Sequence, residues 1–126
     1  MISFGTDIAK RWYKKILLHG ELGAGKTHFT KGFCNHFDID LKLITSPTYT
    51  YLNEYQDKVL HIDMYRIENR ELLQQKWILD LIHDYEYIII ERPKFTELYI
   101  DDSRTNITIN KKSETERKIK LDQTTV

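Results

Sequence analysis

A glycine-rich motif in the first quarter of the chain has the residue types of a phosphate-binding loop. It matches the pattern G-x-x-x-x-G-K-[ST] at each fixed position and reads Gly20-Glu21-Leu22-Gly23-Ala24-Gly25-Lys26-Thr27. Glycines allow the backbone of such a loop to point successive N–H groups at phosphate oxygens. The pattern assigns the β- and γ-phosphates to Lys26 and a magnesium ion to the Thr27 hydroxyl. We expect the Lys26 side chain to be exposed to solvent and to face the phosphates. The motif therefore predicts binding of a nucleotide with Mg²⁺, whereas hydrolysis requires further residues.

The segments on either side of the motif predict the strand and the helix that a phosphate loop needs. The apolar run Ile16-Leu17-Leu18 predicts a short buried strand over residues 15–19. Three phenylalanines follow the motif at four-residue intervals, namely Phe29, Phe33 and Phe37. Their spacing predicts a helix over 26–37, whose N-terminus adds partial positive charge beside the phosphates. We therefore expect the motif, together with His28, to form the nucleotide-binding segment.

Two acidic residues end predicted buried strands further along the chain. Glu91 follows the apolar run that begins at Tyr87, and Asp63 ends the run that begins at Val59. A phosphate-loop enzyme needs such a carboxylate to hold magnesium or its water shell, and Glu91 matches the usual pattern better. Asp63 lies two residues after His61, so the two side chains point the same way on a strand. One carboxylate would bind the metal and the other would orient the attacking water, although strand-end acids also cap helices or face solvent.

A loop with two hydroxyl side chains lies between the predicted phosphate helix and Asp63. Its residues are Ser46-Pro47-Thr48. Loops at this place often sense the γ-phosphate through a hydroxyl, which makes Ser46 and Thr48 candidate switch residues. A plain turn is the alternative, and the residue types alone do not choose between the two.

The rest of the pattern predicts a mixed α/β fold. We expect helices or helical regions over 7–14 and 68–83 (broken into two short helices) and a short turn or helix over 97–101. We expect strands over 41–44, 48–55, 59–63, 87–90, 105–110 and 117–121. Two pairs of these strands are separated by turns and predict antiparallel hairpins, one of them at the C-terminal end. The expected fold is a phosphate-loop NTPase-like mixed sheet flanked by helices, in a single domain over 1–126.

The composition narrows the classes of function. Basic and acidic residues number 19 each, so the net charge is zero and free-standing nucleic-acid binding is not favoured. Cys34 is the only cysteine, which excludes an internal disulfide and favours a small core residue. No apolar stretch approaches membrane-spanning length and the N-terminus lacks a signal-peptide core, so we expect a cytoplasmic protein without a membrane partner.

Several further blocks, taken with the phosphate loop, resemble the TsaE family, also called YjeE. In chain order they are Ser46-Pro47-Thr48-Tyr49-Thr50, Asn53-Glu54-Tyr55, His61-Ile62-Asp63-Met64-Tyr65-Arg66 and Ile90-Glu91. They come in the family's order and at similar spacing, over roughly residues 15 to 93. Many ATPases share the phosphate loop, whereas the S-P-T-[FY]-T and H-[FI]-D-x-Y-R blocks are much more specific.

The resemblance implies a P-loop ATPase of bacterial tRNA threonylcarbamoyladenosine biosynthesis. Such an ATPase uses ATP and Mg²⁺ and acts with the TsaB–TsaD complex, in which TsaD is the transferase, so it meets tRNA only indirectly. By motif, Lys26 and Thr27 would hold phosphate and magnesium, and Glu91 would complete the magnesium site. Asp63 would be needed for hydrolysis. Ser46 and Thr48 would belong to a switch-like loop.

The chain departs from the family pattern in two places. It has Glu91-Arg92-Pro93 where the family usually has Glu-Trp-Pro, so the aromatic surface is absent. The segment before the phosphate loop is short, and Thr6 is the candidate there for the family's nucleotide-contacting residue.

Two other classes of function remain open. A small-molecule kinase would share the phosphate loop, but 126 residues leave little room for an arginine-bearing lid and an acceptor pocket. A non-catalytic adaptor would bind nucleotide only to set a conformation, and the presence of both Asp63 and Glu91 argues against it.

Overall fold

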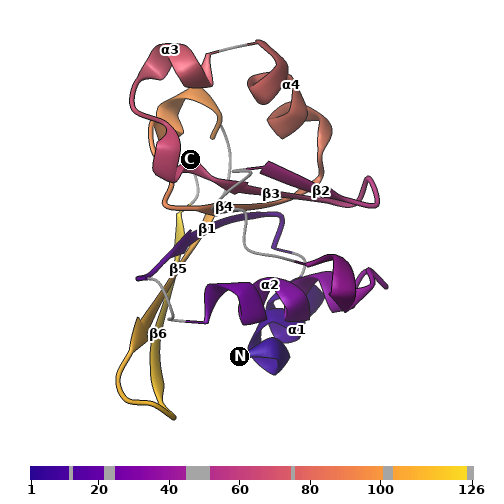
Figure 1. Cartoon of the computed structure of the whole chain (residues 1–126), viewed down its shortest axis with the longest axis vertical. Coiled ribbons are helices and arrows are strands. Elements are labelled where there is room, and N and C mark those ends of the chain that lie inside the picture. Colours follow the sequence, from indigo (N-terminus) through magenta and orange to yellow (C-terminus); the bar gives the residue numbers. More distant parts are fainter. Residues whose placement is uncertain (12, 22–24, 45–51, 75, 101–103, 125–126) are drawn as a thin grey trace.

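The structure, a computed structural model, describes residues 1–11, 13–21, 25–44, 52–74, 76–100 and 104–124. Its centre is a six-stranded sheet with the strand order β2-β3-β4-β1-β5-β6 (Figure 1). The strands are β1 (Lys15–His19), β2 (Leu52–Tyr55), β3 (Val59–Asp63), β4 (Tyr87–Glu91), β5 (Arg104–Lys111) and β6 (Arg117–Thr124). The inner strands β3, β4, β1 and β5 run parallel, whereas β2 and β6 pair antiparallel at the two edges. The sheet is thus mixed, with the expected antiparallel hairpin at its C-terminal edge.

Helices cover both faces of the sheet (Figure 1). The helices are α1 (Ile2–Lys10), α2 (Lys26–Asn35), α3 (Arg70–Leu73) and α4 (Lys76–Asp84), and the short 3₁₀ helices are Leu41–Leu43, Met64–Arg66 and Thr96–Leu98. In the view of Figure 1, α1 and α2 lie below the sheet and α3 and α4 lie above it. The mixed α/β architecture flanked by helices confirms the fold predicted from the sequence.

The continuous apolar runs form central strands because both faces of the sheet are buried. Side chains of β1 alternate between two apolar cores: Ile16 and Leu18 pack with Phe29 and Phe33 of α2, and Leu17 faces the opposite core. The same alternation separates the neighbouring isoleucines of β4. This two-sided burial fixes the register of the strands whose ends carry the candidate site.

Two glycines allow α1 to lie directly against α2. A methyl group on Gly5 would lie 2.1 Å from the Phe29 carbonyl oxygen, and one on Gly32 would lie 1.8 Å from the Ile2 carbonyl oxygen. The Thr6 hydroxyl donates to the Gly32 carbonyl at 2.9 Å. The Thr6 hydroxyl therefore joins the two helices, and the geometry gives no support to Thr6 as a nucleotide contact.

Two predicted elements were wrong. The helix expected over 7–14 is α1 at Ile2–Lys10, because the glycine-mediated contact with α2 stabilises a helix that glycine alone would disfavour. The strand expected over 41–44 is a 3₁₀ helix, in which the Asp40 side chain accepts from the Lys42 backbone N–H and so starts a helical turn.

The other elements agree with the sequence predictions where the structure describes them. The region 68–83 is indeed two short helices, and both hairpins are antiparallel. The first half of the strand expected over 48–55 lies outside the described residues, as does the end of the segment 97–101. Within the described ranges, no helix is long and apolar enough to cross a membrane.

Candidate functional site

The predicted site residues meet at the carboxyl ends of three adjacent parallel strands. The end of β1 leads into the phosphate loop, and its Leu18 is the register partner of Glu91 on β4. Glu91 in turn pairs with Asp63 on β3. Ligand sites of open α/β sheets form at this edge. The strand order therefore brings together two carboxylates and a glycine loop that are far apart in the sequence.

The two glycines described in the loop adopt conformations that side chains rarely permit. Gly20 has a φ of 151° and Gly25 a φ of 106°. Gly25 caps α2, and its carbonyl accepts the Phe29 N–H at 3.0 Å, so the loop leads directly into the helix. Thr27 is partly exposed and His28 is exposed in the first turn. Glu21 is also exposed, while Leu22, Gly23 and Ala24 lie outside the described residues.

Lys26 is buried, which corrects the expectation that its side chain faces solvent. Only 6% of the residue is exposed. Its Nζ donates to the Gly20 carbonyl at 2.7 Å and lies 3.6 Å from Glu91 Oε1. A buried ammonium group needs such partners because its desolvation is costly. The Lys26 side chain thus connects the start of α2 to Gly20 at the beginning of the loop, and it lies next to the Glu91 carboxylate on β4.

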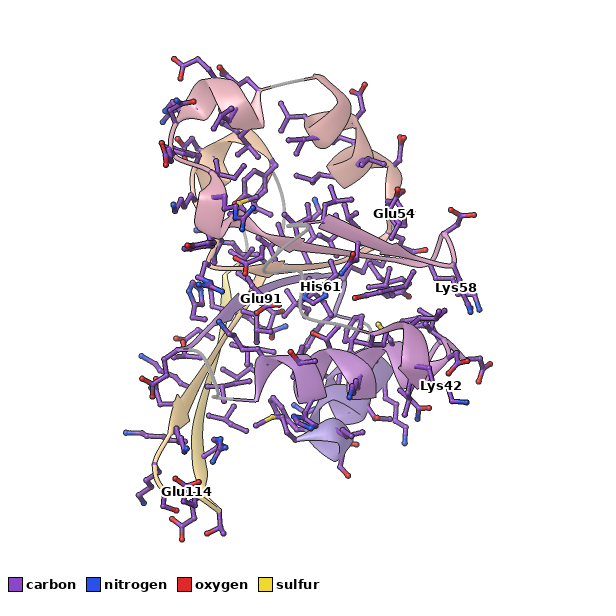
Figure 2. All side chains as sticks on the ribbon, in the orientation of Figure 1. Lys42, Glu54, Lys58, His61, Glu91 and Glu114 are labelled. Carbon is purple, nitrogen blue, oxygen red and sulfur yellow. The ribbon has the colours of Figure 1, made fainter. Side chains whose placement is uncertain are left out.

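Glu91 forms the centre of a buried polar cluster. Its Oε2 lies 2.5 Å from His61 Nε2, and both side chains are buried. On its other side, His61 Nδ1 lies 3.3 Å from the Tyr55 hydroxyl. Figure 2 labels His61 and Glu91 close to one another at the level of the sheet.

The charge state of Glu91 follows from these neighbours. Burial alone would raise the pKa of the Glu91 carboxyl. The hydrogen bond and charge of His61, together with the charges of Lys26 and Arg92, outweigh the effect of burial and lower the pKa of Glu91 below its usual value. Glu91 is therefore an ionised carboxylate despite its burial, as a metal-binding oxygen donor must be.

His61 is a site residue whose partner the sequence did not reveal. Its place two residues before Asp63 predicted that these two side chains point the same way. The sequence did not indicate that His61 forms a hydrogen bond with Glu91 on the neighbouring strand. The contact is diagonal across β3 and β4, because Asp63 is the direct register partner of Glu91 and His61 pairs with Ile89. Only the adjacency and register of these two strands could have identified the contact.

Asp63 is held by donors at both oxygens. It is 1% exposed, and its Oδ1 accepts the Tyr65 backbone N–H at 2.9 Å. Its Oδ2 accepts from Arg92 Nη2 at 2.8 Å, so Asp63 and Glu91 have different cationic partners. The candidate switch residues Ser46 and Thr48 lie outside the described residues, so their predicted role stays a prediction.

The donor set fits magnesium better than a metal held by protein ligands alone. No group of three or more His, Cys, Asp or Glu in the described ranges could hold a metal ion. Mg²⁺ typically takes one or two carboxylates together with substrate phosphates and water. An ionised Glu91 beside the loop and a partly exposed Thr27 at the start of α2 provide that kind of incomplete shell.

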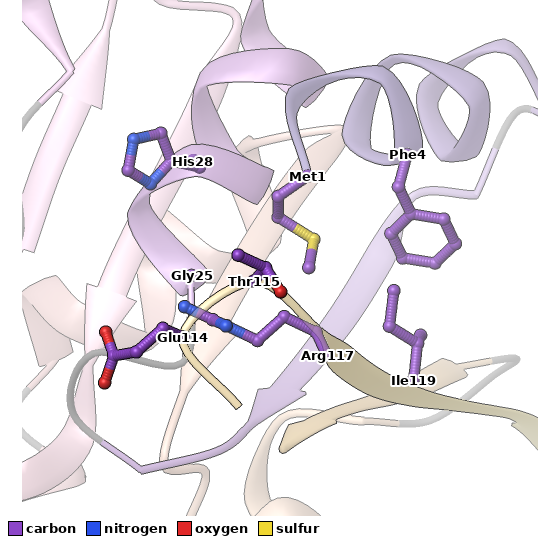
Figure 3. Close-up of a pocket in the computed structure, with 8 residues that line it drawn as sticks. All are labelled: Met1, Phe4, Gly25, His28, Glu114, Thr115, Arg117 and Ile119. Atoms are coloured by element: carbon purple, nitrogen blue, oxygen red, sulfur yellow. The ribbon is translucent and has the colours of Figure 1, made fainter. Parts of the chain in front are cut away.

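A cavity of about 390 Å³ opens beside the end of the phosphate loop (Figure 3). Gly25 and His28 of the loop and α2, with Met1 and Phe4 of the N-terminal segment, form one side of it. Glu114, Thr115, Arg117 and Ile119 from the C-terminal hairpin form the other. The lining is both apolar and polar, and its volume is within the range of small-molecule sites.

The sheet, its flanking helices and the glycine loop after β1 define an α/β protein with a phosphate-loop-like fold. The family model described as "Threonylcarbamoyl adenosine biosynthesis protein TsaE" matches residues 1–119. The chain belongs to the TsaE family.

Curated relatives and a solved structure agree with this assignment. The chain is 35% identical over 107 residues to a "tRNA threonylcarbamoyladenosine biosynthesis protein TsaE" of Bacillus subtilis, an alignment that covers 82% of this chain and 66% of the relative. A relative of the same name from Borreliella burgdorferi is 36% identical over 85 residues, covering 64% of this chain and 61% of that protein. The chain thus spans slightly less than two thirds of the length of these two relatives. The crystal structure of Bacillus subtilis YdiB superposes with a TM-score of 0.64 at 27% identity, covering 100% of this chain and 82% of that one.

Proposed function

We propose that this protein binds ATP with Mg²⁺ and hydrolyses it as a component of the machinery that makes threonylcarbamoyladenosine in tRNA. The observation that carries the proposal is the contact between the phosphate-loop lysine and the strand-end carboxylate, with Lys26 Nζ 3.6 Å from Glu91 Oε1. The names of the family and of its relatives supply the biological process.

Four residues at the start of α2 and at the ends of β3 and β4 would have separate roles in this reaction. Lys26 would exchange the Gly20 carbonyl for phosphate oxygens, because a charged acceptor is a stronger partner than a neutral one. Thr27 and Glu91 would hold magnesium, which when bound neutralises charge on the phosphates. Asp63 would orient the attacking water. Arg92 donates to one of its oxygens at 2.8 Å and holds the carboxylate in place.

The cavity beside Gly25 supports a nucleotide over free phosphate as the ligand. It starts at the end of the loop, where the nucleoside of a nucleotide with loop-bound phosphates would extend outward. Phe4 and Ile119 give it apolar surface. Residues 20–28 would hold the phosphates, and this cavity would take the sugar and the base.

The partner in this proposal is the TsaB–TsaD complex. The protein would act there as a single ATPase domain over 1–126 in the cytoplasm, and it would meet tRNA only through the complex. Its zero net charge agrees with an indirect role, because nothing supplies an overall electrostatic attraction to RNA. Ser46 and Thr48 would sense the γ-phosphate, and a change in their loop would signal its presence to the partner.

The test is ATP binding and turnover with purified protein, Mg²⁺, and cognate TsaB–TsaD added or omitted. We expect slow hydrolysis by the protein alone and faster hydrolysis with the complex, with Thr48→Ala losing the stimulation. Phosphoryl transfer to a small acceptor would instead indicate a kinase. Binding without hydrolysis, even with the complex present, would indicate a non-catalytic adaptor, and no stimulation by TsaB–TsaD would contradict the proposed partner.

A further inference from the structure

Arg92 stands at the end of β4 with an unusual backbone conformation. It directly follows Glu91 and has a φ of 50°, in the left-handed region that non-glycine residues rarely adopt. Its backbone N–H donates to the Leu18 carbonyl at 3.2 Å, which anchors this turn to β1. From this position the side chain reaches across to the end of β3.

The guanidinium group of Arg92 contacts Asp63 and the residue that flanks it. Nη2 donates to Asp63 Oδ2 at 2.8 Å, and the group lies 4.9 Å from the centre of the Tyr65 ring. Tyr65 also donates its backbone N–H to Asp63 Oδ1. The ion pair, the ring and the backbone together leave the Asp63 carboxylate little freedom to rotate.

Arg92 is the cation that compensates the charge of Asp63. Asp63 is 1% exposed, and Arg92 is the one residue that forms an ion pair with it in the described part of the chain. Lys26 pairs with Glu91 instead. Without Arg92, the buried carboxylate would have to reorient or take up water.

Stability alone does not account for the placement of Arg92. The left-handed backbone is strained for a non-glycine residue, and Nε is buried without a hydrogen-bond partner among the described residues. Both features cost free energy. Strain and unsatisfied groups of this kind cluster at functional sites, where a side chain must be held in one position.

We propose that Arg92 is a positioning residue that fixes the Asp63 carboxylate for attack of water on the bound nucleotide. This inference rests on the proposed ATP hydrolysis. Arg92 acts through Asp63, so its loss lowers turnover and leaves the phosphate-binding contacts of Lys26 in place. A fixed acceptor matters because small displacements of reacting groups reduce rates strongly.

The experiment compares Arg92→Gln, Arg92→Lys and Arg70→Gln in the full chain with TsaB–TsaD present. Arg70 is the matched control, because it also forms an ion pair, with Glu97, and lies 5.5 Å from an aromatic ring, that of Phe95. We expect Arg92→Gln to lower kcat about tenfold to a hundredfold. KM for ATP and the Kd for a fluorescent ADP analogue should stay within about threefold of the parent values, because the phosphate loop is unchanged. Arg92→Lys keeps the charge without the planar guanidinium and should recover part of kcat, whereas Arg70→Gln should match the parent.

A double-mutant cycle with Asp63→Asn tests the route of the effect. Arg92→Gln should change kcat less than about twofold in the Asp63→Asn background, because there is no carboxylate left to position. The urea midpoint of unfolding is a readout independent of activity. The shifts caused by Arg92→Gln and Asp63→Asn should not add up in the double variant, because the two side chains are in direct contact.

The outcomes separate this inference from the proposed function. If the parent protein hydrolyses ATP and Arg92→Gln retains its kcat, the positioning role of Arg92 is wrong and the proposed function stands. If the Arg92→Gln effect persists undiminished in Asp63→Asn, the residue acts by another route and the inference is also overturned. If the parent protein neither binds nor hydrolyses ATP, the proposed function fails first and the inference fails with it.

Discussion

His61 Nε2 lies 2.5 Å from Glu91 Oε2, and the two side chains are buried at the centre of the site. The pair joins β3 to β4 at their carboxyl ends, next to the phosphate loop. It orients one carboxylate oxygen away from the loop and leaves the other, Oε1, on the side of Lys26. Metal ligands depend on such outer partners for their orientation, so in the proposed function His61 orients the Glu91 carboxylate.

Replacing His61 with phenylalanine should destabilise the protein by about 3 kcal/mol, because the buried Glu91 carboxylate loses its nearest donor. Tyr55→Phe, which removes only the hydroxyl 3.3 Å from His61 Nδ1, should cost about 1 kcal/mol. Urea unfolding monitored by circular dichroism measures the free energy of unfolding of both variants. A His61→Phe protein as stable as the parent would show that the hydrogen bond contributes nothing to the fold.

Lys26→Met should abolish detectable binding of ATP. The substitution keeps most of the aliphatic length but removes the charge that contacts Gly20 and Glu91. Since the ammonium group is buried, the free energy of unfolding should also fall by about 1–2 kcal/mol. Calorimetric titration with ATP measures the affinity. Lys31→Met, on the same helix, is the control and should bind ATP like the parent; equal binding by Lys26→Met would refute the phosphate-loop assignment.

Glu91→Gln and Asp63→Asn should separate metal binding from water activation. Both substitutions keep the size of the side chain and remove its charge. We expect each to lose most ATP hydrolysis, and Glu91→Gln alone to raise the Mg²⁺ concentration needed for tight ATP binding. The measurements are turnover and ATP affinity as functions of Mg²⁺ concentration. Normal turnover by Asp63→Asn in the assembled complex would remove Asp63 from the chemistry.

Gly32→Ala should destabilise the fold by about 1–3 kcal/mol, although alanine is the better helix former. The added methyl group would lie 1.8 Å from the Ile2 carbonyl oxygen, so α1 must move away from α2. Thermal or urea unfolding tests this. Asn35→Ala changes an exposed position of α2 and should stay within about 0.5 kcal/mol of the parent. Parental or greater stability of the Gly32→Ala variant would mean that the two helices are not in close contact.

Cys34 should resist thiol reagents in the folded protein. Burial raises the pKa of its thiol from 9.0 to about 12, so the reactive thiolate is scarce at pH 8. Because the unfolded thiol ionises at lower pH, its contribution to stability is complete below pH 9 and is lost as the pH rises toward 12. Reaction with a chromogenic disulfide should be slow in buffer and rapid in urea. Rapid labelling of the native protein at pH 8 would contradict the buried position.

The local patterns of the sequence determined the kinds of element and the residue types of the site. The buried strands β1 and β4 followed from continuous apolar runs, and the hairpins followed from alternation around polar turns. The phosphate loop, Asp63 and Glu91 could be predicted because each belongs to a short sequence pattern: closely spaced glycines for the loop, and an acidic residue directly after an apolar run for the two carboxylates. The position of α1 was not recognisable, since its closeness to α2 depends on a contact between Gly5 and the distant Phe29 backbone.

The tertiary structure alone decided which charges face one another. The sequence showed His61 and Asp63 on one side of a strand. The strand order and register place Glu91 in contact with His61 and Lys26, and place Asp63 in contact with Arg92. Asp63 and Arg92 are 29 residues apart along the chain and His61 and Glu91 are 30 apart, and no local pattern encodes such pairings. The burial of Lys26 has the same origin, because whether a loop lysine meets water or a carboxylate depends on the strand that the sheet places beside it.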